Sequence, residues 1–448
     1  MQPTRADQPL RSFRQDAYRS LGRRNDSLFE LLEAALGSSG PANLVHLSLV
    51  EAFRRRWPSV SDALAEGQVY PARCRALIHQ YLDAPADGGR PVWVGDTTTW
   101  ERSAAKTSPE RTWGHRSTAG IPQDGVVPAW EYEWLVDTPE PGSSWVRPLD
   151  VRRRGPRAGT PTQVAVRVVR AALARYRAGA ARPVGAYDSS YDPVTFVRAE
   201  LAADIDILVR LRTNRRFFRA PGPYAGRGPH RKHGDVLKIS DPTTHGTPDR
   251  TATLADPVHG QVQVDSWEDL HVQTAADAPF TLVRIDVERL PRHTKRPKPI
   301  WLAWIGGALP DDLHDLWRWY CRRYLVEHGF RFLKHDLGWT TVRPSHPHAA
   351  DRWSWLLALA LWMLWLARPL VADCRLPWER PLPPHRLTPV RVRRACPALF
   401  RQLGTPARPP RTRGISPGRR LGQTQTPRER FQPVRRRQNA PPNARLKR

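Results

Sequence analysis

Apolar side chains recur at helical spacing through the first 85 residues of the chain. Ser27 and Glu30 form a capping box, which is a signal for the start of a helix. Further helical patterns cover residues 44–57 and 72–82. We therefore predict a helical N-terminal domain, residues 1–85. Its first clear helix has an apolar face made of Leu28, Leu31, Leu32, Ala35 and Leu36.

From residue 91 the pattern changes to short strand-like runs separated by turns that contain Pro and Gly. Three strand patterns come first, and helical and strand patterns then alternate. Three antiparallel strands followed by such an alternation are typical of a ribonuclease-H-like α/β fold, a mixed sheet with flanking helices. The strand patterns cover residues 92–98, 131–137, 144–151, 184–188 and 206–212, and the helical patterns cover residues 162–176 and a segment opened by Pro193.

Two helical patterns near the C-terminal third complete this fold. The first covers residues 311–334, and the second covers residues 350–371 and is apolar enough to be buried. The second holds about 15 consecutive largely apolar residues, fewer than the roughly 20 that cross a bilayer, so we expect no membrane partner. Residues 86–212 and 305–372 are thus predicted to form one domain of this fold.

Two segments fall outside that domain. Residues 213–304 carry strand patterns at 261–264 and 280–288, and we interpret them as a β-rich insertion. Residues 373–448 are rich in Pro and Arg, and the part from 386 onward holds 18 Arg or Lys residues and one acid. Such a composition is typical of a disordered basic tail.

The charge balance of the chain indicates which class of molecule it binds. The 448 residues include 71 basic and 43 acidic side chains, a formal net charge of +28. An excess of this size favours a polyanion through counterion release, and DNA is the leading candidate. We expect the N-terminal helical domain to bind it.

The cysteines and the N-terminal residues indicate the cellular compartment in which we expect the protein. The four cysteines lie far apart without a C-x-x-C pair, so neither a zinc site nor a disulfide framework is indicated. Residues 1–21 lack the apolar core of a signal peptide. We expect a cytoplasmic protein.

The first group of candidate functional residues lies on one face of the helix predicted over residues 311–334. Tyr320, Arg323, Glu327 and Lys334 stand at spacings that place all four within roughly 60° of helical arc. A carboxylate flanked by two cations and a phenol can hold a divalent metal beside a phosphate. The alternative is that Glu327 belongs to an ordinary solvated helix face.

Two aspartates elsewhere in the chain extend this group of candidate residues. Asp96 and Asp188 each follow an apolar strand pattern, where a carboxylate can project into a cleft or can merely stabilise a turn. Together with Glu327 they form the set of carboxylates that two-metal phosphoryl transfer requires. Oxygen ligands suit Mg²⁺ best, with Mn²⁺ as a substitute.

These residues together resemble the DDE transposases of bacterial insertion sequences, in the subgroup with a Tyr-Arg-Glu-Lys signature. The resemblance implies a ribonuclease-H-like fold in which Asp96, Asp188 and Glu327 are the catalytic metal ligands. It also implies that Tyr320, Arg323 and Lys334 contact phosphates of the element end. Residues 105–111 resemble the family too, and we expect Lys106 within them to contact DNA.

The resemblance implies a transposase that cuts DNA at terminal inverted repeats and joins the ends to target DNA, as a dimer in the synaptic complex. Two alternatives stay open: a catalytically inactive DNA-binding relative, and a structure-specific nuclease of the same fold. Arg210 and Arg212 alternate on a predicted strand, so they share a face. They suit phosphate contacts, and they equally suit charges that protect a sheet edge.

Overall fold

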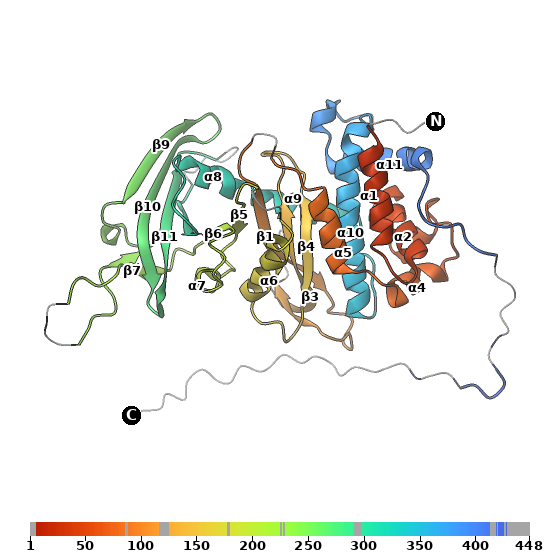
Figure 1. Cartoon of the computed structure of the whole chain (residues 1–448), viewed down its shortest axis with the longest axis horizontal. Helices are drawn as coiled ribbons and strands as arrows, with labels where there is room; N and C mark the ends of the chain where they lie inside the picture. Colours follow the sequence, from red (N-terminus) through yellow and green to blue (C-terminus); the bar gives the residue numbers. More distant parts are fainter. Residues whose placement is uncertain are drawn as a thin grey trace.

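The chain forms an elongated body with long strands at one end, a mixed sheet in the middle and a group of helices at the other end (Figure 1). The computed structural model describes residues 6–85, 88–115, 125–176, 180–224, 226, 229–290, 297–412, 418, 420–424 and 427.

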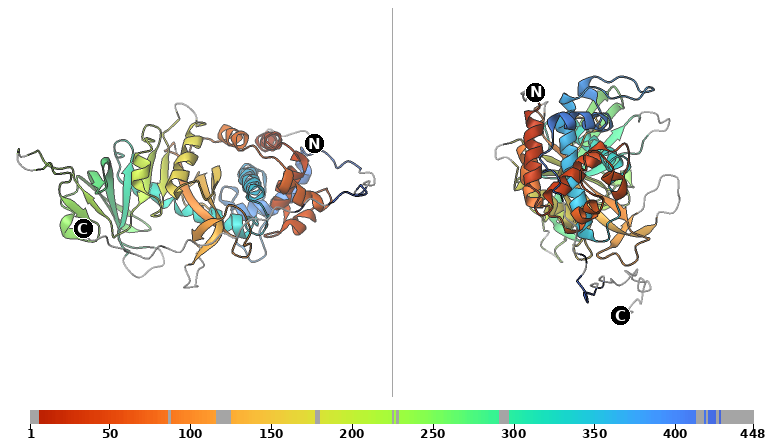
Figure 2. Two further views of the ribbon diagram at one scale, coloured as in Figure 1. Left: turned by 90° about the horizontal axis from the view of Figure 1, so that it is seen from below. Right: turned by 90° about the vertical axis from the view of Figure 1, so that its right-hand side faces the viewer.

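The helical end is built around α10 (Pro347–Ala367), whose side chains are buried along most of its length. Figure 2 shows α10 end-on in its left view, with the N-terminal helices beside it. By length and composition alone the segment Pro347–Leu370 could cross a membrane, but most of it is enclosed by the protein. The predicted buried helix is therefore confirmed. The N-terminal helices are α1 (Gln8–Arg19), α2 (Asn25–Gly37), α3 (Leu44–Ser48), α4 (Pro58–Glu66) and α5 (Pro71–Gln80).

The central strands of a larger sheet lie in the order β4-β3-β1-β5-β6. β3 is antiparallel to both β1 and β4, whereas β5 is parallel to both β1 and β6. This is the ribonuclease-H-like arrangement, with α6 (Pro161–Leu173) and α7 (Pro193–Val197) between the later strands. The strands are β1 (Val92–Glu101), β3 (Val126–Asp137), β4 (Arg147–Arg154), β5 (Val184–Tyr187) and β6 (Asp206–Arg210), and a short β2 (Thr112–His115) pairs with β3.

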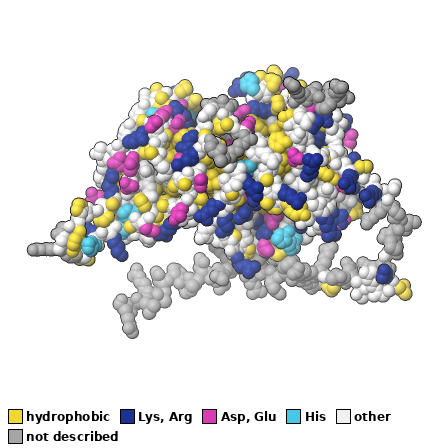
Figure 3. Space-filling view, in the orientation of Figure 1, with side chains coloured by type: hydrophobic (Ala, Val, Ile, Leu, Met, Phe, Trp, Pro, Cys, Tyr) yellow, Lys and Arg dark blue, Asp and Glu magenta, His cyan; other side chains and the backbone are white. Residues whose placement is uncertain are grey.

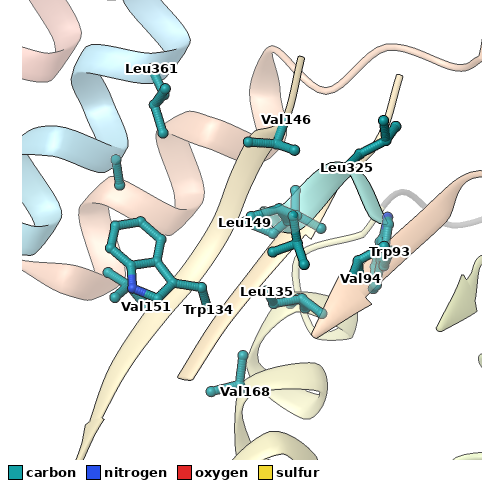
Figure 4. Close-up of a cluster of buried hydrophobic side chains, with 14 of the residues drawn as sticks. Trp93, Val94, Trp134, Leu135, Val146, Leu149, Val151, Val168, Leu325 and Leu361 are labelled. Atoms are coloured by element: carbon teal, nitrogen blue, oxygen red, sulfur yellow. The ribbon is translucent and has the colours of Figure 1, made fainter. Parts of the chain in front are cut away.

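Apolar side chains from helices and strands meet on this sheet. Figure 4 shows Leu361 of α10 on the side of the sheet that carries Trp134 of β3 and Val151 of β4, and Val168 of α6 beside Leu135 of β3. These five side chains are buried, and they belong to one continuous core. Because that core includes the N-terminal helices, it fixes the helical end against the sheet.

The β-rich insertion is present, and it continues the central sheet. β12 pairs antiparallel with β6 on one side and with β11 on the other. The last strand of the predicted insertion, residues 213–304, therefore also extends the ribonuclease-H-like sheet. The strands are β7 (Arg216–Phe218), β8 (Val236–Lys238), β9 (Arg250–Asp256), β10 (Gly260–Val272), β11 (Ala275–Val287) and β12 (Ile300–Ile305), with a short 3₁₀ turn, η1 (Pro242–Thr244).

The prediction that residues 373–448 form a disordered tail is wrong for the first part of that segment. α11 (Pro389–Leu403) packs on α2 and α10 through buried Val392, Cys396 and Phe400. Its composition looked too polar to fold alone, but neighbouring helices supply the apolar partners. Short 3₁₀ turns, η2 (Arg368–Leu370) and η3 (Pro384–Arg386), connect α10 to α11. Most of residues 413–448 lies outside the described ranges.

Two predicted helices differ from the structure. The pattern over 44–57 yields only α3, because the chain turns before Pro58 opens α4. The single helix predicted over 311–334 is two, α8 (His314–Cys321) and α9 (Tyr324–His335). At the junction the amides of Leu325 and Val326 bond to carbonyls three residues back, a 3₁₀ pattern that tightens the chain.

Candidate active site

Asp96 and Asp188 lie side by side on adjacent strands. β1 and β5 are parallel with Val92 level with Val184 and Val94 level with Ala186. The same register, continued by two residues, brings Asp96 level with Asp188. Since neighbouring strands are about 4.8 Å apart, both carboxylates start from adjacent backbone positions.

The local setting of the two aspartates is not the same. Asp96 lies inside β1 and does not end a strand, because β1 continues to Glu101. Asp188 directly follows β5, and its Oδ1 accepts hydrogen bonds from the Ser190 amide at 2.8 Å and the Ser190 hydroxyl at 2.6 Å. The turn alternative considered for Asp188 is thus real, and it orients the carboxylate.

The helical signature approaches these aspartates from α8 and α9. Arg323, at the junction of the two helices, is 7% exposed and donates to Glu327 Oε1 at 2.9 Å. Lys334 is half-buried near the end of α9. Tyr320 is fully buried, so its hydroxyl does not face solvent where DNA would lie. Glu327 and Lys334 therefore form the accessible part of the signature, and Arg323 lies buried beside Glu327.

Electrostatic effects connect Asp96 with the other two acids and with the helical signature. Burial raises the pKa of Asp96 to about 7, and the charges of Asp188 and Glu327 raise it as well, whereas Arg323 opposes them. Burial lowers the pKa of Lys334, and the charge of Asp96 acts in the other direction. Asp96 is thus at the centre of a group drawn from two strands and one helix.

The donor set fits a hard divalent cation in its chemistry. Asp96, Asp188 and Glu327 offer only oxygen, and the crowding that raises the pKa of Asp96 is the condition that a cation relieves. In the part of the chain that the structure describes, no three His, Cys, Asp or Glu side chains are spaced as a finished metal site. Glu327 instead pairs with Arg323. Metal binding would require Glu327 to turn from Arg323 toward the aspartates.

Sequence reasoning missed a fourth carboxylate beneath the site. Glu133 of β3 is paired with Thr97 of β1, so both side chains point to the face opposite Asp96. Glu133 Oε2 accepts from the Thr97 hydroxyl at 2.8 Å and from the Tyr191 hydroxyl at 2.6 Å. Thr97 follows Asp96 and Tyr191 is three residues past Asp188, so Glu133 ties together the segments that carry both aspartates.

Glu133 is only 1% exposed, and its Oε1 has no hydrogen-bond partner within the described ranges. Burial raises its pKa to about 8, the hydrogen bonds from Tyr191 and Thr97 oppose this, and Asp96 and Asp188 add to the rise. The only signal in the sequence was an acid inside a strongly apolar strand, and its alternation with Tyr132 and Trp134 suggested a solvent-facing position.

The other three predicted DNA contacts, Lys106, Arg210 and Arg212, lie in three different settings. Lys106 is exposed next to a groove of about 550 Å³, which Lys334 and Arg343 line together with residues 99–105. Arg210 ends β6, and its charge acts on Tyr320. Arg212 is exposed beyond the strand, so the expected alternation of the two arginines on one strand face is wrong.

Comparisons with known proteins give the family that the chain matches. A family model described as DDE superfamily endonuclease matches residues 16–272, which is more than half of the chain, and one described as Transposase DDE domain matches residues 308–363. No curated protein matches significantly. Among solved structures, the piggyBac transposase synaptic complex with hairpin DNA is similar, with 11% identity and a TM-score of 0.42 over 85% of this chain and 73% of that chain.

Proposed function

The chain belongs to the DDE superfamily endonucleases, of the transposase type, and from that membership we propose that it cuts DNA at the ends of a mobile element and transfers the cut strand to target DNA. The observation that supports the proposal is the register of β1 and β5, which brings Asp96 level with Asp188, together with the effect of the Glu327 and Arg323 charges on Asp96. We place the protein in the bacterial cytoplasm, associated with the nucleoid.

Asp96, Asp188 and Glu327 would hold Mg²⁺, or Mn²⁺ in its place. When bound, the cations supply Lewis acidity to the attacking and leaving oxygens. A water oxygen attacks the phosphorus at the element end and the bond to the 3′ oxygen breaks, which leaves a 3′ hydroxyl and a 5′ phosphate. In the second step the 3′ hydroxyl attacks a target phosphodiester, and a target 3′ hydroxyl leaves.

The protein's own side chains position the DNA and balance its charge. Lys334 lines the groove beside Asp96, where its ammonium suits a phosphate of the element end. Arg323 would neutralise charge near the reacting phosphate once Glu327 releases it. Synapsis of two element ends implies a dimer on DNA.

The test is cleavage of duplexes that carry the inverted repeats flanking the coding region, with Mg²⁺ or Mn²⁺. Asp96→Ala, Asp188→Ala and Glu327→Ala should each abolish cleavage and joining while leaving DNA binding in EDTA intact. Asp277→Ala is the control, since Asp277 pairs with Arg198 on the exposed face of β11, away from the site. Cleavage that persists in the three variants would rule out the assigned site.

One observation favours the alternative of a catalytically inactive DNA-binding relative. Glu327 is bound to Arg323 at 2.9 Å and is 58% exposed at its side chain, an arrangement without metal ligation. That alternative predicts binding indifferent to Mg²⁺ and no cleavage products at any metal concentration. A structure-specific nuclease would instead prefer an RNA–DNA hybrid or branched DNA over the terminal-repeat duplex in competition.

A further inference from the structure

Strand β9 lies at an open edge of the large sheet. It pairs antiparallel with β10 on one side, and among the residues that the structure describes no strand pairs with its other side. Figure 1 shows β9 at the outer edge of the long strands, at the opposite end from the N-terminal helices. An open edge offers a row of unpaired amides and carbonyls to another strand. β9 contains no Pro or Lys, which commonly protect such an edge.

The register shows which backbone groups of β9 point outward. The Gln261 carbonyl accepts from the Glu288 amide, so the backbone of Gln261 faces away from β9. Because this direction alternates along a strand, the neighbouring Val262 faces β9 and bonds to its paired residue, Leu254. Alternate residues of β9 therefore direct their amides and carbonyls outward. These residues are Thr251, Thr253 and Ala255.

The sequence of β9 is complementary to itself. It reads Arg-Thr-Ala-Thr-Leu-Ala-Asp, with a base at one end, an acid at the other and Thr253 in the middle. Two copies paired antiparallel about Thr253 would place Arg250 opposite Asp256 of the second copy, and Ala252 opposite Leu254. Every outward amide and carbonyl of the three outward-pointing residues would then have a partner. A slip by two residues would separate Arg250 from Asp256, so the charges select this register.

Both charged residues of β9 keep groups that can pair between copies. Arg250 donates through Nη2 to two backbone carbonyls, at 3.1 Å each, and it pairs with no acid in the described part of the chain. Asp256 accepts its hydrogen bonds from the turn residues Val258 and His259 at Oδ1. Its side chain is 25% exposed. Nε and Nη1 of Arg250 and Oδ2 of Asp256 are therefore left for an ion pair with the second copy.

The charge around β9 disfavours DNA as the partner of this edge. Residues 249–288 hold eight acidic and two basic side chains, whereas the whole chain has a formal net charge of +28. In the view of Figure 3, basic side chains are spread over the middle of the molecule, and many acidic ones lie toward the end with the long strands. Such a surface repels a phosphate backbone. A protein strand is the better partner, and a second copy of β9 supplies one with matching charges.

We propose that β9 is the contact surface of a homodimer that forms without DNA, in which the β9 strands of two copies pair antiparallel about Thr253. The same surface is used by both copies, so the contact closes at two. Because β9 is joined through β10, β11 and β12 to β6, the contact would unite both sheets into one. The two catalytic sites would then have a fixed separation before DNA binds. The dimer that synapsis implies needs DNA, and this one does not.

The test is the mass of the DNA-free chain, measured by sedimentation from low to high micromolar concentration. The wild type should shift from monomer to dimer. Thr253→Pro should stay monomeric, because Pro removes the outward amide at the two-fold axis and leaves the hydrogen bonds to β10 intact. Thr253→Ala keeps that amide, so it is the matched control and should dimerise like the wild type. Equal melting temperatures of the two variants at low concentration would separate lost dimerisation from lost folding.

A second pair of variants tests the charges, and it decides the question if Thr253→Pro does not fold. Asp256→Asn keeps an oxygen for the turn amides and removes both ion pairs, so the dissociation constant of the dimer should rise about fivefold. Asp269→Asn is the control, since Asp269 is exposed on β10 outside the β9 pairing. Equal constants for these two variants would overturn the register.

Three results of the mass measurement would overturn the proposed surface. They are a wild type that stays monomeric at every concentration, a dimer that persists in folded Thr253→Pro, and growth beyond two copies. Neither DNA nor metal is present in these measurements, so failure here differs from failure of the proposed reaction.

Discussion

Replacement of Glu133 by Gln should remove a strong pH dependence of stability. Glu133 is enclosed beneath the catalytic acids, and burial raises its pKa from 4.5 to about 8. Gln keeps the shape and an oxygen that accepts from Thr97 and Tyr191, but it has no charge to bury. The variant therefore isolates the free energy that ionisation of this side chain costs the folded state.

The sign and size follow from proton linkage. The unfolded chain loses the Glu133 proton near pH 4.5 and the folded chain keeps it to about pH 8, so folding binds an extra proton between these values. The contribution of Glu133 to stability is therefore complete below pH 4.5 and is lost as pH rises through 8. Between pH 5 and pH 8 the wild type should lose about 4 kcal/mol relative to Glu133→Gln, at about 1.4 kcal/mol per pH unit.

The assay is urea unfolding of both proteins in EDTA at pH 5, 6, 7 and 8. The free energies of unfolding should be similar at pH 5 and diverge as pH rises, with the variant more stable at pH 8. Glu268→Gln is the control, since Glu268 is exposed on β10, and its difference from the wild type should stay constant. If the curves of wild type and Glu133→Gln run parallel from pH 5 to 8, the buried ionisation does not exist as argued.

Three further predictions address packing, charge and metal binding. Gly329→Ala should lower the free energy of unfolding in urea by about 1–3 kcal/mol, because the added Cβ would lie 2.6 Å from Val146 Cγ2. Val146→Ala should suppress this loss, because it removes the methyl group that the Cβ would meet. Additive losses in the double variant would contradict this explanation. Arg14→Ala should cost about 3–5 kcal/mol, because it leaves the Glu33 carboxyl, 3% exposed, without its ion-pair partner. Arg19→Ala on the same helix should cost under about 1 kcal/mol, because Arg19 is 69% exposed. Similar losses for the two variants would refute the distinction. The affinity for Mn²⁺, measured by calorimetry, should fall as pH drops below about 7, because the cation must displace a proton from Asp96. An affinity that does not change between pH 6 and pH 8 would show that Asp96 is not a ligand.

Several local features were readable from the sequence. The change from helical to strand periodicity at residue 91 predicted where the sheet begins, and the order of strands and helices predicted the ribonuclease-H-like topology. The apolar run of α10 predicted its burial, because a helix that is apolar all round has no solvent face. The spacing of Tyr320, Arg323, Glu327 and Lys334 predicted one helix face, but the 3₁₀ junction leaves Tyr320 on α8, and only Glu327 and Lys334 lie within α9.

The sequence alone could not show which helices and strands pack against one another. α11 is too polar to fold alone, yet α2 and α10 bury its apolar side, and Arg393 donates to the Ala35 carbonyl there. Glu133 alternates with Tyr132 and Trp134 like a solvent-facing strand residue, but Tyr187 and Tyr191 close over that face of the sheet. Periodicity is a property of neighbours in the chain and so predicts local conformation, whereas burial, the pairing of charges and the pKa values that follow are set by contacts between distant segments, which only the tertiary structure fixes.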